Sequence, residues 1–226
     1  MAQATTTVLQ TTPTSDPNPS LIYLEAGADF VLPVVFPDYI IHVYDAQEVE
    51  VLGKKIKTPS LDLPELGHAG VLIVNGKTGS TRYGEYGRYP GGGKVPGVVR
   101  TRPIPDVTIK GGAITESSLK RTLRYLSVEA GQSGPISGVV LRGDVFEKSV
   151  EWLKQKKAEN SNSKRAPYNL RNHNCITFVA DLVDELGLDS PFRGPVVVPS
   201  VFIKQFQLAK PDLEYNYQTD TLEITE

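Results

Sequence analysis

The 226-residue chain contains a single cysteine, Cys175, and a lone thiol excludes both an internal disulfide and a zinc site built from several thiolates. Apolar residues recur after it at helical spacing, which predicts a helix that starts near Asn174, ends at Gly187 and turns Cys175 toward the core in its first turn. Unpaired N–H groups and the positive end of the helix dipole favour thiolate over thiol at that position. Cys175 is therefore a candidate nucleophile, and the alternative that it is an inert apolar filler stays open.

Three histidines are available as the base that a cysteine nucleophile needs. His173 lies just outside the predicted helix, where its ring would point away from an inward-facing thiol. His42 falls inside an apolar run that is typical of a structural histidine. His68 opens a predicted strand among small neighbours, which would let a substrate or another backbone approach closely. We therefore expect His68 to be the general base.

An Asn-Gly turn after the strand of His68 predicts a hairpin, GHAGVLIV paired with STRYGEYGRY. The second strand then carries Glu85 past His68, where a carboxylate would hold the imidazole in its working tautomer. A solvated charge on a hairpin is the alternative for Glu85. Tyr83 and Tyr86 are expected to bond the imidazole, an oxyanion or the substrate, and Asn174 is a further candidate for substrate contact.

The remaining segments predict an α+β fold, an antiparallel sheet packed against a few helices. Strand-like runs fill residues 21–53, and residues 87–97 form a loop rich in glycine and proline that we expect to border the site. Helices are expected over residues 115–128, capped by Thr115, and from about Asp144 to Lys157, with Asp144 and Glu147 as a capping box. The final residues suggest a closing or edge strand. Residues 1–20 are polar and predict a flexible arm before one domain at 21–226.

Composition narrows the function classes. A net charge of -2 gives no reason to expect nucleic acid as a ligand. The sequence has no apolar run long enough to span a bilayer and no conventional secretion signal at its start, so we expect a soluble product made in the cytoplasm. Histidines and carboxylates show none of the usual metal-binding spacings, and no cofactor is expected.

With these residues the chain resembles the permuted branch of the papain-like superfamily, in which the histidine strand precedes the cysteine helix. The resemblance rests on Gly67-His68-Ala69-Gly70, then Asn174-Cys175 and Phe178, and spans about residues 60–190. The hairpin GHAGVLIVNGKTGSTRYGEYGRYP is similar to that of NlpC-like toxins exported by type VI secretion systems of Gram-negative bacteria. This likeness implies Cys175 as nucleophile, His68 as base and Glu85 as third member. Permuted relatives vary at the third position.

The same resemblance implies a peptidoglycan peptide as substrate, the periplasm of a rival cell as the place of action, an immunity protein in the producer and a carrier in the secretion apparatus. The predicted reaction is hydrolysis of an amide bond by a cysteine peptidase or amidase. Two alternatives remain: a lipid acyl hydrolase or acyltransferase that uses the same dyad, and a non-catalytic binding module with the same fold. An apolar groove beside Cys175 would favour lipid.

Overall fold

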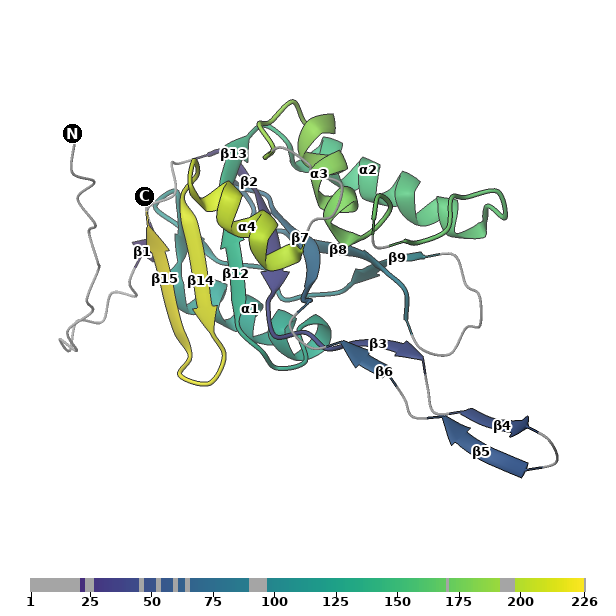
Figure 1. The fold of residues 1–226 in the computed structure, drawn as a ribbon. Coiled ribbons are helices and arrows are strands. Elements are labelled where there is room, and N and C mark those ends of the chain that lie inside the picture. The colour runs from purple at the N-terminus through teal and green to yellow at the C-terminus, as the bar shows by residue number, and fades with distance from the viewer. Residues whose placement is uncertain are drawn as a thin grey trace, which may run out of the picture.

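The computed structural model describes residues 21–22, 27–44, 47–51, 54–58, 61–63, 66–89, 97–169, 171–191 and 198–225. Its centre is an antiparallel sheet of eight strands, drawn in Figure 1. Seven strands follow one another across it in the order β15 (Thr221–Thr225), β14 (Asp212–Asn216), β12 (Ile136–Val139), β2 (Asp29–Phe36), β7 (His68–Val74), β8 (Thr81–Gly87) and β9 (Val98–Arg102), and β13 (Leu141–Gly143) also pairs with β2. The sheet therefore joins strands from both ends of the described chain.

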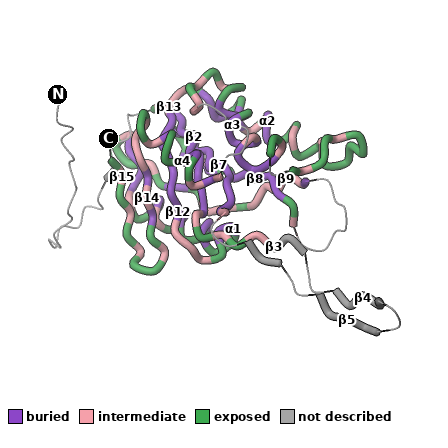
Figure 2. Tube along the Cα trace, in the orientation of Figure 1, coloured by how far each residue is buried: buried purple, intermediate pink, exposed green. Residues whose placement is uncertain are grey.

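Helices cover both faces of this sheet. On one face, α2 (Phe146–Ala158), α3 (Cys175–Glu185) and α4 (Pro199–Gln207) enclose a core with the odd-numbered apolar residues of β7. The opposite face packs against α1 (Glu116–Ala130). A short 3-10 helix (Glu159–Ser161) continues α2 at its C-terminal end. Figure 2 shows that buried residues are concentrated in the central strands and α3.

The central strands β2 and β7 are buried along their whole length, which explains why their sequences are nearly continuous apolar runs. Pro33 lies inside β2, although proline cannot donate a ladder hydrogen bond. The partner strands change at this point: β13 pairs as far as Val31, and β12 pairs from Val34 onward. Pro33 therefore sits where the ladder is interrupted.

Shorter strands form three small sheets beside the main one. In the first, β11 (Ala113–Thr115) pairs with both β1 (Leu21–Ile22) and β10 (Ile109–Lys110). The second joins β3 (Ile41–Tyr44), which contains His42, to β6 (Leu61–Leu63). The third is a hairpin of β4 (Gln47–Val51) and β5 (Lys54–Thr58) that projects from the body in Figure 1.

The structure confirms the expected α+β class, the hairpin β7–β8 and the helix after Thr115. The expected cap of α2 is wrong: Val145 is the N-cap residue and no side chain of its own segment caps the helix. Instead Asp29, at the start of β2, accepts hydrogen bonds from the N–H groups of Val145 at 3.2 Å and Phe146 at 3.0 Å. A carboxylate from a distant strand therefore replaces the predicted Asp144.

Two further elements differ from expectation near the C-terminal end. The apolar segment after residue 198 folds as the helix α4, with Pro199 in its first turn, and the tail forms two strands in place of one. No helix in the described ranges is both long and apolar enough to cross a membrane. The expected arm at 1–20 lies outside the described residues, as do residues 90–96 of the expected loop. The single-domain boundary stays a prediction.

Candidate active site

Cys175 is the first residue of α3, and the local sequence fixes the helix start there. The side chain of Asn174 accepts hydrogen bonds from the N–H groups of Ile176 at 2.9 Å and Thr177 at 3.1 Å. The Thr177 hydroxyl in turn accepts one from the N–H of Asn174 at 2.9 Å, which completes a capping box. Cys175 is 3% exposed and packs in the core between α3 and the sheet.

His68 begins β7 and is 5% exposed. Aromatic rings surround its imidazole: the ring centroids of Tyr39, Tyr89 and Phe36 lie 5.1, 6.3 and 6.4 Å from that of His68. On the neighbouring strand, a Cβ atom at Gly87 would lie 3.3 Å from the imidazole Cε1. The Tyr89 ring lies closer still, at 3.0 Å, so glycine at position 87 leaves room for both Tyr89 and His68.

The structure brings Cys175 and His68 into contact. Burial alone would lower the pKa of His68, but interaction with the Cys175 thiol and with Glu85 outweighs it and raises the pKa from 6.5 to about 9. A histidine with this pKa is protonated at neutral pH. A protonated histidine next to a cysteine is an arrangement that activates cysteine nucleophiles.

Glu85 stands on the other side of the imidazole, as the register of β7 and β8 requires. Its Oε2 lies 3.3 Å from His68 Nε2, and the carboxylate is only 1% exposed. Tyr83 donates its hydroxyl to the same oxygen at 2.9 Å, while Arg102 Nε donates to Oε1 at 3.3 Å. Burial on its own raises the pKa of Glu85, but His68, Arg102 and Tyr83 together lower it. Glu85 is therefore a buried carboxylate that stays charged and faces His68.

Tyr83 reaches Glu85 because Gly70 leaves space for it. A Cβ atom on Gly70 would lie 2.3 Å from the Tyr83 hydroxyl oxygen, far inside van der Waals contact. Tyr83 is 1% exposed, so its ring has no room to move aside. The structure thus places Tyr83 behind Glu85 and gives it a partner there.

Tyr86 points to the opposite face of the sheet, among the rings of Tyr168, His173 and Phe178 at centroid distances of 5.4, 5.1 and 6.1 Å. Burial, followed by the charge of Arg165, lowers the pKa of His173, which is the histidine that the sequence placed away from the thiol. The structure therefore brings Cys175, His68, Glu85 and Tyr83 together, while Tyr86 lies with Cys175 in the core under α3 and away from Glu85. Substrate contact by Tyr83, Tyr86 and Asn174 stays a prediction.

Several neighbours of the site did not stand out in the sequence. Tyr168 lies close to Cys175 because the backbone of Asn169 pairs with that of His173 across a tight loop. Burial and then Cys175 raise the pKa of the Tyr168 hydroxyl. Arg100 and Arg102 are two residues apart on β9, the strand beside β8, so both side chains lie on the face of Glu85. This spacing is the signal in the sequence that could have identified them.

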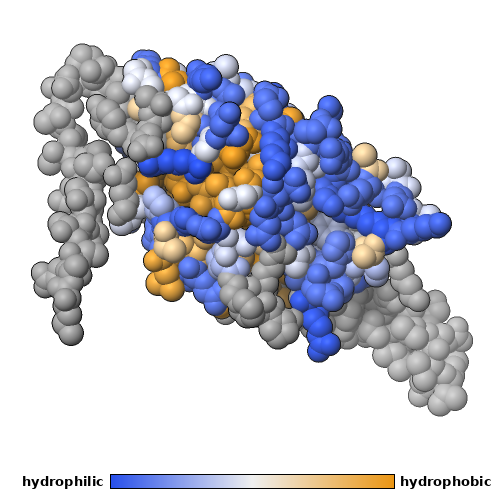
Figure 3. Space-filling model, turned by 90° about the horizontal axis from the view of Figure 1, so that it is seen from above, coloured by the Kyte–Doolittle hydropathy of each residue, from blue (hydrophilic) through white to orange (hydrophobic). Residues whose placement is uncertain are grey.

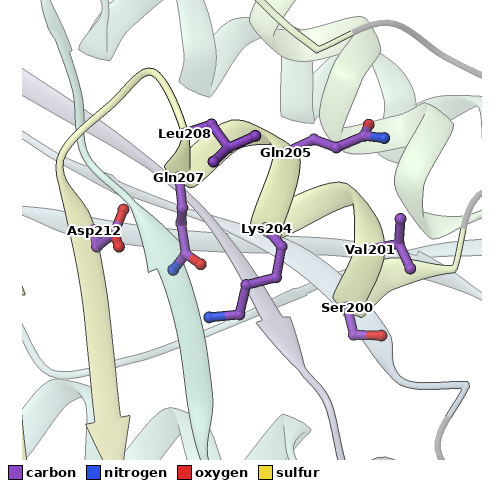
Figure 4. A pocket seen from close by; sticks show the side chains of 7 residues that line it. All are labelled: Ser200, Val201, Lys204, Gln205, Gln207, Leu208 and Asp212. Atoms are coloured by element: carbon purple, nitrogen blue, oxygen red, sulfur yellow. The ribbon is translucent and has the colours of Figure 1, made fainter. Parts of the chain in front are cut away.

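A hollow elsewhere on the surface lacks this chemistry. It lies on the outer side of α4 and is lined by the residues labelled in Figure 4: Ser200, Val201, Lys204, Gln205, Gln207, Leu208 and Asp212. It contains no cysteine or histidine, and its Lys204 pairs with Glu214 at 3.0 Å. Figure 3 shows apolar side chains gathered in the left half of the face seen from above, with hydrophilic ones over most of the rest. No group of three potential metal ligands occurs within the described part of the chain.

Comparison with known proteins places the chain in a family. Residues 31–186 match the family described as type VI secretion system effector TseH-like. A crystal structure of the type VI secretion system effector TseH is 47% identical in sequence, with a TM-score of 0.76 over 89% of this chain and 100% of that one. No curated relative matches the sequence. The chain therefore belongs to the TseH-like family of type VI secretion system effectors.

Proposed function

We propose that this effector is a cysteine amidase that hydrolyses a peptide amide bond of peptidoglycan in the periplasm of a rival bacterium. The observation that supports this most directly is the constellation of Cys175 at a helix start, His68 in contact with it and Glu85 at 3.3 Å from the imidazole. The chain order, histidine strand before cysteine helix, agrees with a permuted papain-like enzyme. An immunity protein in the producing cell is part of this proposal.

In the proposed reaction, the Cys175 sulfur attacks the carbonyl carbon of the scissile amide. His68 donates its proton to the leaving nitrogen, the C–N bond breaks, and a thioester remains on Cys175. Water then attacks the thioester while His68 takes its proton, which releases a carboxylic acid and restores the thiolate. Glu85 holds the imidazole in place through both steps.

The oxyanion of each step needs a donor near the sulfur. The side chain of Asn174 already occupies the N–H groups of Ile176 and Thr177. This cap does not use the N–H of Cys175, which lies against the Tyr168 hydroxyl; an oxyanion would replace that hydroxyl as its acceptor. The proposed role of Asn174 is accordingly to fix the helix start and so to aim that N–H.

A digestion of purified sacculi tests the proposal. Wild-type protein and Cys175→Ala are incubated with sacculi, and the released muropeptides are identified by mass spectrometry. We expect new peptide fragments with wild type alone, with both proteins equally folded by circular dichroism. Equal release by both proteins, or none by either, would remove the cell-wall hypothesis. Release of fatty acid from phospholipid vesicles by wild type, without muropeptides, would support the lipid alternative.

A further inference from the structure

Arg100 is a half-buried cation beside the candidate site, and none of the carboxylates that the structure describes pairs with it. It lies on β9 directly opposite Glu85 in the strand register. Its guanidinium carbon is 3.3 Å from the centroid of the Tyr89 ring, so the plane of the group is covered by an aromatic face. Among the described residues, no carboxylate pairs with it and no hydrogen bond engages its N–H groups.

Arg102, two residues along the same strand, has a different arrangement. Its Nε donates to Glu85, and its other end lies 3.8 Å from the Glu129 carboxylate on α1. Glu85 contacts Arg102 through Oε1 and both Tyr83 and His68 through Oε2, and no ion pair joins it to Arg100. Within the described part of the chain, Arg102 therefore binds the carboxylate that faces His68, and Arg100 has neither a hydrogen-bond acceptor nor an ion-pair partner.

The free donors of Arg100 lie near the reacting groups. Tyr89, which Arg100 covers, meets the His68 ring edge-on at a centroid distance of 6.3 Å. Tyr39, whose ring is 5.1 Å from that of His68, lies close enough to Arg100 and to Cys175 for both groups to act on it. Tyr39 and Tyr89 thus flank the imidazole, and Arg100 lies against Tyr89.

A partly desolvated guanidinium without a counter-ion is costly unless it has a ligand to bind. Its planar fork of donors matches a carboxylate, which accepts two parallel hydrogen bonds. We propose that Arg100 binds a carboxylate of the substrate, so that the site selects an acidic peptide over its uncharged counterpart. This inference rests on the proposed function, because peptidoglycan stem peptides bear free carboxylates close to their amide bonds.

The test compares stem peptides that differ by one charge. The substrates are an L-Ala-γ-D-Glu-diaminopimelate-D-Ala peptide and a series in which each carboxylate in turn is converted to the primary amide. The readout is the ratio of kcat/KM between the acidic peptide and each amide. We expect wild type to disfavour one amide by about tenfold or more, as loss of a charged hydrogen bond implies, and Arg100→Gln to bring that ratio close to one.

Matched variants separate this role from a general effect. Arg82→Gln removes an exposed arginine from the neighbouring strand and should keep the wild-type ratio, while Arg100→Lys should keep part of the preference. Equal cleavage of all peptides by wild type, or an undiminished preference in Arg100→Gln, would overturn the role assigned to Arg100 and leave the proposed function standing. Cleavage of no peptide by wild type would instead count against the proposed function, and the inference would fall with it.

Discussion

The substitution Glu85→Gln removes the negative charge next to the imidazole of His68 and keeps the size of the side chain. Carboxylate and imidazole are 3.3 Å apart, and both are almost fully buried. At an effective dielectric constant near 20, two charges at that separation attract by about 5 kcal/mol, which is an upper bound. Arg102 and Tyr83 already share the carboxylate, so the net effect is smaller.

Since about 1.4 kcal/mol corresponds to one pKa unit, we expect the pKa of His68 to fall by about one to three units from its value of about 9. The sign follows from the charge: without Glu85 the imidazolium is less stable, so it loses its proton at lower pH. The alkaline limb of the profile of kcat/KM against pH should move down accordingly. At neutral pH the rate should fall by about 10² to 10³, because the imidazole also loses its orienting partner.

The assay is release of peptide from a soluble stem peptide between pH 5 and 10, with Arg102→Gln as the opposing control. Removing the Arg102 cation strengthens the hold of Glu85 on His68, so that variant should move the alkaline limb upward. The two variants must therefore shift the limb in opposite directions. A limb that stays in place in Glu85→Gln would refute the electrostatic role of Glu85.

Three further predictions concern stability. Asp29→Ala should lower the free energy of unfolding by about 2–4 kcal/mol in urea titrations, because the N–H groups of Gly76, Val145 and Phe146 lose their acceptor; a loss below about 0.5 kcal/mol would contradict this cap. Gly70→Ala should cost about 1–3 kcal/mol through its clash with Tyr83 and should lower activity as well, and an unchanged urea midpoint would refute the packing argument. The raised pKa of His68 stabilises the folded state fully below pH 6.5, and this contribution disappears as pH rises through about 9. His68→Ala should therefore flatten the pH dependence of the urea midpoint over this interval, and a parallel curve would count against it.

Much of the candidate site was predictable because its determinants are local. The apolar spacing after Cys175 and the capping residue Asn174 fix the start of α3 within a few residues of sequence. The hairpin register then carries Glu85 past His68, since antiparallel strands joined by a short turn pair their neighbours. These two local rules supplied three of the residues that the structure brings together.

The rest of the fold and of the site could not be predicted because it depends on contacts between segments far apart in the sequence. Asp29 caps a helix more than a hundred residues later, and no local pattern links it to Val145. Arg102 reaches Glu85 from the adjacent strand β9, and Tyr39 meets His68 only after β2 and β7 pair. The helix α4 was missed because its apolar residues follow a proline and valine run that also fits a strand.

The most direct test of the central claim is to identify the bond that the enzyme forms with its substrate. Because Cys175 is the only cysteine, a gain in intact mass that is lost in Cys175→Ala, after reaction with a stem peptide ending in a chloromethyl ketone, reports alkylation of that thiol. We predict that wild type gains the mass of one peptide, that Cys175→Ala gains none, and that His68→Ala reacts far more slowly. Equal labelling of wild type and His68→Ala, or labelling that persists in Cys175→Ala, would contradict the account.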